Sequence, residues 1–387
     1  MRAVTCHDGV LEVVEMPTPA PGPKQVLLKV TRSGICGSDL HARTHCDASA
    51  DVAVEVGYDA FMRPGDTVVM GHEFTGEVVS YGPSTRRRWP VGTPVVSLPV
   101  LKHGDEVHMV GLSQHAPGGY AEYVVVDEAM TMPVPAGLAP ELAALTEPLA
   151  VARHAVRRSE VRRKDTAVVI GCGPIGLAVI LMLKAAGVKR VVASDLSAGR
   201  RELAWRCGAD EVVDPAQTSP WDTPAVDGRY ERTATGLFGT AIDAMDALQR
   251  LPHVPWWRAM RAAEKAGAVP SGPVVFECVG VPGIIEQIVT GAPMRSRVVV
   301  VGVCMEPDTF RPTMASNKEI DLRFAFCYDP AEFRETLHMV ADGTVDPRPL
   351  LTGTVGLAGV AHAFEVLGNA DQHAKVMVDP RSDVAAL

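Results

Sequence analysis

The chain has 387 residues, of which 47% are hydrophobic and 21% charged, with a formal net charge of −9. These values suit a soluble enzyme of two or three domains and argue against nucleic acid as a partner. We expect no membrane span and a cytoplasmic location, because no apolar run approaches 18 residues and the N-terminus lacks a signal-peptide pattern. The eight cysteines include no C-x-x-C pair, which favours reduced thiols over disulfides.

Residues 1–146 contain short alternating apolar runs separated by Gly and Pro, which predicts an antiparallel β-rich domain. From about residue 147, continuous apolar runs alternate with helical patterns. This order predicts parallel βαβ units in a doubly wound sheet, hence an α/β fold. After about residue 328 the alternating polar and apolar pattern of residues 1–146 returns, so we expect the C-terminus to rejoin the first domain. The predicted domains are residues 1–157, completed by 328–387, and a cofactor domain of residues 158–327.

The stretch SGICGSDLH (33–41) raises the question of whether Cys36 is an inert buried residue or a metal ligand. The stretch VVMGHEFTGEV (68–78) adds His72 and Glu73, and TEPLAVARHAV (146–156) adds Glu147 at the start of a predicted helix. Taken alone, each has a bland explanation, such as a core thiol, a satisfied histidine or a first-turn acid. Together, thiolate, imidazole and carboxylate suit a catalytic Zn²⁺.

The stretch VVIGCGPIG (168–176) has a G-x-G-x-x-G pattern between a predicted strand and a predicted helix. In this context the three glycines allow a dinucleotide pyrophosphate to approach the helix N-terminus. Asp195 ends the next strand and can bind both ribose hydroxyls, which favours NAD over NADP. Arg200 can reach the same ribose or, alternatively, a 2′-phosphate. A plain strand–helix turn is the simpler alternative for the glycines. The predicted cofactor residues of the loop and next strand are Gly171, Gly173, Pro174, Ile175, Gly176, Asp195 and Arg200.

The chain resembles the zinc-dependent medium-chain dehydrogenase/reductases of the alcohol dehydrogenase superfamily. The matching pieces are GICGSDLH, GHEFTGEV, PGGYAEYVVV (117–126), TEPLAVA and VVIGCGPIGLA, in family order. The resemblance implies a GroES-like catalytic domain and a Rossmann cofactor domain. Glu147 in TEPLA resembles the polyol and threonine dehydrogenase branch.

The resemblance also implies roles for individual residues. Cys36 and His72 become zinc ligands, while Glu73 and Glu147 compete for the remaining places, directly or through water. His72 and Glu73 can both bind only if the backbone turns there, which Gly71 permits. Asp39 is expected to fix the orientation of a zinc ligand, His72. Ser38 and His41 are expected to relay the proton released from the alcohol. Val301 and Val303 are expected to contact the nicotinamide through backbone atoms. Loop hydrogen bonding is the alternative for Ser38 and His41.

The chain departs from the family pattern in three places. The lobe at 97–120 has no cysteine, so we predict one catalytic zinc and no structural zinc. Its three histidines, His103, His108 and His115, are expected to be polar surface. The segment 42–70 is long and is expected to border the substrate cleft, with Tyr58, Phe61 and Met62 lining it or forming minor core.

The third departure is an insert at about 217–268. It predicts helices over 235–251 and 255–270 and holds Trp221, Trp256 and Trp257. We expect this helical pair to pack on the cofactor domain or on a partner subunit.

The residues and the resemblance together predict a zinc- and NAD-dependent dehydrogenase of a small-molecule alcohol. The resemblance of Glu147 to the polyol branch implies a secondary alcohol or polyol, which would be converted to a ketone or aldehyde. Two alternatives are a zinc-free NADPH-dependent quinone or enoyl reductase of the same fold and a non-catalytic NAD-binding protein. The ligand set opposes the first, and the proton relay opposes the second. In relatives the strand at 319–328 pairs across a dimer, so a homodimer or homotetramer is expected.

Overall fold

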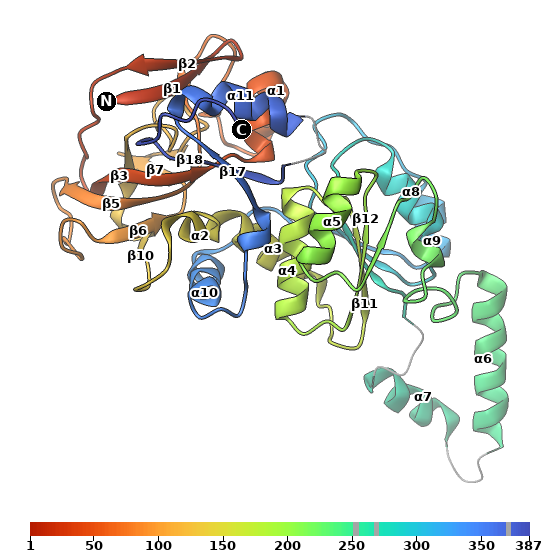
Figure 1. Ribbon diagram of the computed structural model, residues 1–387. Coiled ribbons are helices and arrows are strands. Elements are labelled where there is room, and N and C mark those ends of the chain that lie inside the picture. The colour runs from red at the N-terminus through yellow and green to blue at the C-terminus, as the bar shows by residue number, and fades with distance from the viewer. Residues whose placement is uncertain (251–254, 267–270, 369–372) are drawn as a thin grey trace.

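The structure is a computed structural model that describes residues 1–250, 255–266, 271–368 and 373–387. Figure 1 shows a β-rich domain that carries both termini, a second domain around a parallel sheet, and two helices that stand apart from both. Within the described ranges, no helix has the length and apolar character needed to cross a bilayer.

The β-rich domain is organised around β3, which is almost entirely buried because strands flank it on both sides. Its main sheet has the order β10-β6-β5-β3-β18-β17, and β9 also pairs with β3. A second sheet has the order β2-β1-β4, and β7 pairs with β8. The strands are β1 (Arg2–His7), β2 (Val10–Glu15), β3 (Gln25–Gly34), β4 (Val68–Val69), β5 (Glu73–Tyr81), β6 (Pro94–Ser97), β7 (Val100–His103), β8 (Glu106–Met109), β9 (Tyr123–Asp127), β10 (Thr131–Pro133), β17 (Leu351–Val355) and β18 (Lys375–Val378).

The C-terminal strand β18 lies antiparallel to β3, with Met377 opposite Gly34 and Val378 opposite Ser33. The end of the chain is therefore part of the sheet that carries the N-terminal metal-ligand candidates. The exact domain limits at 157 and 328 stay a prediction.

The second domain contains a six-stranded parallel sheet in the order β13-β12-β11-β14-β15-β16. Chain order runs outward from β11 in one direction and then from β14 in the other, so the switch point lies between these two strands. The predicted doubly wound sheet is confirmed. The strands are β11 (Thr166–Ile170), β12 (Arg190–Ser194), β13 (Glu211–Val213), β14 (Val274–Glu277), β15 (Arg297–Val300) and β16 (Asp321–Phe324).

Helix α4 opens with Pro174 after Gly173, and its residues from Gly176 to Leu183 are all buried. It is apolar around most of its circumference because it lies between the sheet and α3. The helices outside the insert are α1 (Gly37–Glu55), α2 (Pro140–Ala144), α3 (Thr146–Ser159), α4 (Pro174–Ala185), α5 (Ala198–Arg206), α8 (Ile284–Gly291), α9 (Pro312–Asn317), α10 (Pro330–Ala341) and α11 (Val360–Gly368). Short 3-10 turns are η1 (Glu128–Met130), η2 (Pro220–Asp222), η3 (Arg348–Leu350) and η4 (Leu357–Gly359).

Helix α1 occupies much of the segment 42–70 and bends at His45, and the position of this segment beside the substrate cleft stays a prediction. Met62 is buried in the core with Val4 and Ile35, so it belongs to the core alternative. The Tyr58 hydroxyl accepts a hydrogen bond from the Met109 backbone N–H at 2.8 Å, which anchors the end of this segment to β8.

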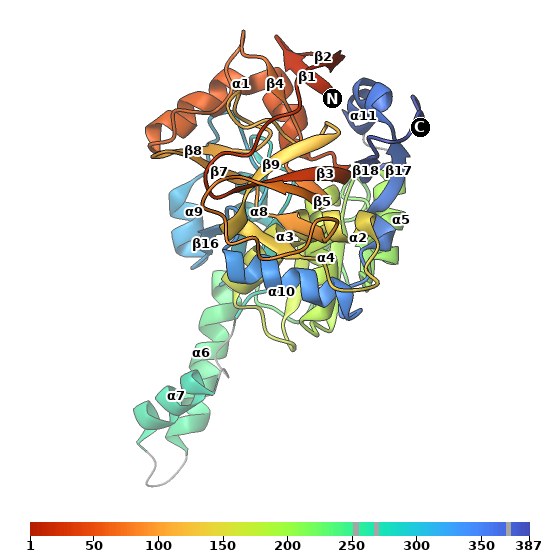
Figure 2. The ribbon, with the colours of Figure 1, turned by 90° about the vertical axis from the view of Figure 1, so that its left-hand side faces the viewer.

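The insert forms α6 (Ala234–Gln249) and α7 (Trp256–Lys265), and neither helix buries a residue. Figure 2 shows the pair extending away from both domains. The expected packing of this helical pair on the cofactor domain is therefore wrong for its described residues. The residues that precede the helices do pack against that domain's core, where Trp221, Ala225 and Val226 are buried. The expected helix ends at Leu251 and at 267–270 lie outside the described residues.

Candidate metal centre and cofactor site

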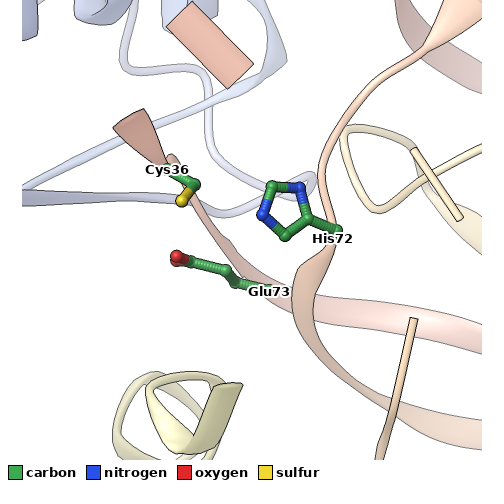
Figure 3. Close-up of side chains that lie close together, drawn as sticks. All are labelled: Cys36, His72 and Glu73. Carbon is green, nitrogen blue, oxygen red and sulfur yellow. The ribbon is translucent and has the colours of Figure 1, made fainter. Parts of the chain in front are cut away.

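Cys36, His72 and Glu73 each direct a potential metal-ligating atom into one small volume. The Cys36 sulfur, a His72 ring nitrogen and a Glu73 carboxylate oxygen all lie within 4.8 Å of one another. Figure 3 shows the three side chains converging from two separate segments of the chain. A soft thiolate, an imidazole and a hard carboxylate form a donor set suited to Zn²⁺.

Two glycines make this convergence possible. Gly71 has a φ of +97°, so the chain turns before His72, as predicted, and a Cβ there would lie 2.6 Å from the Tyr120 ring. Gly34 pairs with Glu73 across β3 and β5, and a Cβ on it would lie 2.1 Å from the Glu73 carboxylate. A side chain at either position would displace the cluster.

Asp39 is fully buried and holds His72 from behind. Its Oδ1 lies 3.1 Å from His72 Nδ1, a contact that is not aligned as a hydrogen bond and therefore acts through charge. Its Oδ2 accepts hydrogen bonds from the Tyr120 hydroxyl at 2.5 Å and from the Cys36 N–H at 3.1 Å. This arrangement directs His72 Nε2 toward the candidate metal position, as an orienting carboxylate does.

Asp39 and His72 shift each other's pKa. Burial alone would lower the pKa of His72, but the Asp39 charge raises it well above its ordinary value. Burial alone would raise the pKa of Asp39, but the His72 charge and the hydrogen bond from Tyr120 lower it overall. The carboxylate is therefore ionised and available to fix the imidazole.

Lys375 is a partner that the sequence reasoning missed. Its ammonium donates to both Glu73 oxygens, at 2.7 and 2.8 Å, and to the Ile35 carbonyl at 2.9 Å. Lys375 is 1% exposed and Glu73 is fully buried. The only sequence signal was a lysine inside the apolar strand AKVMV. Each Glu73 oxygen keeps a further lone pair, so the pair neutralises Glu73 without excluding a metal.

Glu147 lies in the first turn of α3, next to this cluster but outside it. Burial raises its pKa to about 7, and the nearby Glu73 charge acts in the same direction while His72 opposes it. The Tyr328 hydroxyl donates to its Oε1 at 2.9 Å, a second partner that the sequence did not indicate. Glu147 does not join the three atoms that converge. Its ligation, direct or through water, stays a prediction.

Ser38 and His41 both lie near the start of α1, three residues apart and so on one face of the helix. The Ser38 hydroxyl lies 3.3 Å from His72 Nε2, at the edge of the candidate metal position. Partial burial lowers the pKa of His41, and the neighbouring His45 acts in the same direction. His41 remains exposed, so its imidazole can exchange protons with solvent.

The phosphate loop has the geometry that a dinucleotide needs. Gly171 has a φ of +90°, and a Cβ on Gly176 would lie 1.9 Å from the Gly171 carbonyl oxygen. A Cβ on Gly173 would meet only the Arg200 guanidinium, at 4.0 Å, so the space above the helix N-terminus is open. Pro174 and Ile175 begin α4 there. The Arg200 Nε is buried without a partner, an orphaned donor beside an anion-binding helix end.

Asp195 is held in a fixed orientation after β12. Its Oδ2 accepts from the Cys172 N–H at 2.7 Å, and its Oδ1 accepts from the Ser197 N–H at 2.8 Å. Val301 is buried just after β15, whereas Val303 is 51% exposed. These positions lie at the carboxyl ends of parallel strands, where such folds bind their ligands.

The lobe histidines differ in part from expectation. His108 is buried rather than on the surface, and its ring centroid lies 5.4 Å from that of His103 and 5.3 Å from that of His115. Their nitrogens do not form a ligating group of the kind seen around Cys36 in the described part of the chain. All eight cysteines are free, which confirms the prediction of thiols.

Comparison with known proteins extends these findings. The chain matches the family model of the alcohol dehydrogenase GroES-like domain over residues 22–136 and that of the zinc-binding dehydrogenases over residues 174–244. It is 30% identical to (R,R)-butanediol dehydrogenase of Bacillus subtilis, over 98% of this chain and 100% of that relative. It is 27% identical to sorbitol dehydrogenase of Bos taurus, over 92% and 90% of the two chains.

Solved structures agree with these matches. The crystal structure of Bacillus subtilis 2R,3R-butanediol dehydrogenase superposes with a TM-score of 0.74 at 28% identity, over 98% of this chain and 99% of that one. A structure from Sinorhizobium meliloti 1021 bound to NADP has a TM-score of 0.73 at 26% identity, with the same coverage.

A GroES-like domain joined to a dinucleotide-binding sheet, with Cys36, His72 and Glu73 between them, defines a zinc-dependent oxidoreductase of the alcohol dehydrogenase type. The chain belongs to the zinc-dependent medium-chain dehydrogenase/reductase family.

Proposed function

We propose that this enzyme oxidises a secondary alcohol or polyol to a ketone, with NAD as hydride acceptor and one zinc per chain. The convergence of Cys36, His72 and Glu73 within 4.8 Å carries this proposal. Two relatives that align along most of the chain, a butanediol and a sorbitol dehydrogenase, support a substrate with neighbouring hydroxyl groups.

Cys36 and His72 would hold the zinc, and Glu73 or Glu147 would complete its ligands. Bound there, zinc would supply Lewis-acid polarisation of the substrate oxygen. Asp39 keeps the His72 ring oriented. Lys375 offsets the charge of Glu73, which limits the negative charge of the site.

The substrate hydroxyl must lose a proton as its carbon loses a hydride to the nicotinamide. Ser38 lies beside His72 Nε2, where it can accept that proton. His41 would receive the proton next and pass it to solvent, because its lowered pKa keeps the imidazole neutral and able to accept. Val301 and Val303 follow β15 and face the nicotinamide through backbone atoms in this proposal.

The cofactor proposal rests on Asp195. Its carboxylate is fixed by two backbone N–H groups, so it would accept hydrogen bonds from ribose hydroxyls and repel a 2′-phosphate. The relative bound to NADP makes this a point to test directly. We expect kcat/KM with NAD to exceed that with NADP, and Asp195→Ala to narrow the difference. A preference for NADP in the wild type would overturn the assignment.

The remaining proposals concern partners and place. Strand β16 ends the sheet, and beyond it Phe324 and Phe326 are 60% and 76% exposed. Pairing of this edge with a second copy would give a homodimer or, with a further interface, a homotetramer. The charge of −9 supports a small-molecule substrate rather than nucleic acid or an anionic membrane. We propose a cytoplasmic location.

NADH formation across a panel of vicinal diols, polyols, cyclic secondary alcohols and primary alcohols tests the function. Chelator-sensitive turnover of secondary alcohols is the expected result. The Cys36→Ser variant should lose both metal and turnover and keep its NAD affinity. Turnover that survives in metal-free protein would instead support a zinc-free reductase.

A further inference from the structure

The helical pair α6 and α7, here called the arm, is not covered by any other element among the described residues. Neither helix buries a residue, and Figures 1 and 2 both show the arm leaving the cofactor domain on the side away from the β-rich domain. Helices of this length gain most of their stability from packing. The arm thus presents surface that a folded chain would normally cover.

Much of that surface is apolar. On α6, Phe238 and Ile242 are 66% and 68% exposed and lie four residues apart, hence on one face. On α7, Trp256, Trp257 and Met260 are 41%, 55% and 44% exposed. Several exposed side chains of this size on two neighbouring helices are more typical of an interaction surface than of ordinary protein surface.

The charges of the two helices are opposite. Helix α6 carries Asp243 and Asp246 and no basic residue, whereas α7 carries three basic residues and one glutamate. Two ion pairs form within single helices or at their ends, Asp246–Arg250 and Arg261–Glu264. Among the described residues, Asp243 on α6 and Arg258 on α7 form no ion pair, so an acid and a base remain available to a partner.

We propose that the arm is covered by the arm of a second copy of this chain. In a two-fold arrangement, the acidic α6 of each copy lies against the basic α7 of the other, and four helices enclose the exposed aromatic residues. Opposite charge on the two halves of one surface makes the surface complementary to itself.

The exposed apolar surface of the arm is large enough for such an interface. Five large apolar side chains, each about half exposed, offer roughly 500 Å² per copy. Two arms, with their polar neighbours, therefore reach the range of about 1,200 Å² in which stable interfaces begin. A membrane surface is the less favoured occupant, because α6 is acidic and the whole chain has a charge of −9, which anionic lipid repels.

Charge reversal in the full-length protein tests the proposal. Asp243→Arg and Arg258→Asp each place like charges across the two-fold arrangement. Each variant alone should weaken the assembly about tenfold in dissociation constant, measured by sedimentation equilibrium. An equimolar mixture of the two variants should restore it, because each acid–base pair then forms between chains. Asp105→Arg, an exposed reversal in the turn between β7 and β8, is the matched control.

Restoration in the mixture cannot arise from contacts inside one arm, so it would establish pairing between copies. Wild-type mass in both single variants, or no recovery on mixing, would overturn the proposal. Sedimentation of the wild type with phosphatidylserine vesicles, lost in Trp257→Ala, would assign the arm to membranes instead. NADH formation is expected to stay unchanged in every arm variant, which separates this test from that of the proposed function.

Discussion

At the scale of single residues, the buried pair of Lys375 and Glu73 controls the charge of the metal site. Both side chains are almost completely removed from solvent, and the lysine satisfies both carboxylate oxygens. Removing one member of a buried ion pair leaves the other uncompensated, which costs far more than the pair itself contributes. The pair therefore links the C-terminal strand to the metal ligands.

Lys375→Met should destabilise the protein by about 3–5 kcal/mol and reduce its zinc content, because Glu73 would be buried without a counter-charge. Urea unfolding and metal analysis by mass spectrometry measure the two effects. Lys318→Met is the control, since Lys318 is also buried but donates to the carbonyls of Val289 and Thr290, remote from the site. Full zinc occupancy and wild-type kcat/KM in Lys375→Met would contradict this role.

Asp39→Asn should weaken zinc binding by about 10–100-fold with little change in fold. The amide keeps the shape of the side chain but loses the charge that orients His72. Competition with a fluorescent chelator measures the affinity. Tyr120→Phe removes the hydroxyl's hydrogen bonds to Asp39 and to the Gly34 carbonyl but keeps the Asp39 charge, so it should have a smaller effect. Equal zinc affinity in wild type and Asp39→Asn would show that the imidazole needs no such partner.

The raised pKa of Glu147 predicts how the stability of the zinc-free protein depends on pH. Burial raises the pKa of its carboxyl from 4.5 to about 7. Below pH 4.5 the group is neutral in folded and unfolded chains alike. As pH rises from 4.5 to 7, the Glu147 carboxyl ionises in the unfolded chain but not yet in the folded one. The free energy of unfolding therefore falls, in all by about 2–4 kcal/mol. As pH rises through this range, the free energy of unfolding of the Glu147→Gln variant should increasingly exceed that of the wild type. Parallel curves would contradict the raised pKa.

At the scale of elements, the turn from β11 into α4 contains glycines with two different roles. Gly176 lets the helix approach the strand, whereas Gly173 leaves room for a ligand. The two positions belong to one motif but differ in what a methyl group would meet there.

Gly173→Ala should fold with an unchanged melting temperature but raise the KM for NAD at least about tenfold, because its Cβ meets no protein atom closer than 4.0 Å and instead fills the phosphate space. Gly176→Ala should lower the melting temperature strongly, since its Cβ would lie 1.9 Å from the Gly171 oxygen. Thermal unfolding and cofactor titration distinguish the two. A KM for NAD in Gly173→Ala equal to that of the wild type would contradict the assigned position of the pyrophosphate.

Motifs that combine a local pattern with a fixed spacing were predictable. Both domains, the βαβ order and the meeting of Cys36 with His72 and Glu73 followed from the sequence pattern and the resemblance. Contacts between distant segments were not predictable, because no local pattern shows that Lys375 pairs with Glu73 or that Tyr328 pairs with Glu147. Helix α1 was missed for a different reason: it buries only Asp39, Ala42 and Ala50, so it has no apolar periodicity to detect.

At the scale of the whole molecule, the chain offers two candidate contact regions at different places, the β16 edge and the arm (Figure 2). If β16 pairs across a two-fold axis, Phe324→Glu should dissociate that dimer, because an edge strand cannot bury a charge against its copy. Sedimentation velocity measures the change, and Val10→Glu, an exposed valine on β2, is the control. Unchanged sedimentation of Phe324→Glu would place the dimer interface elsewhere.

The position of β18 also bears on how the protein is made. A ribosome delivers Cys36, His72 and Glu73 before the cofactor domain, but Lys375 only after it. The cofactor domain lies between them in sequence and can fold during synthesis as a continuous unit. The metal pocket acquires its counter-charge only when the final strand inserts beside β3. We therefore expect zinc loading to follow the insertion of β18, after the nucleotide-binding half has already folded.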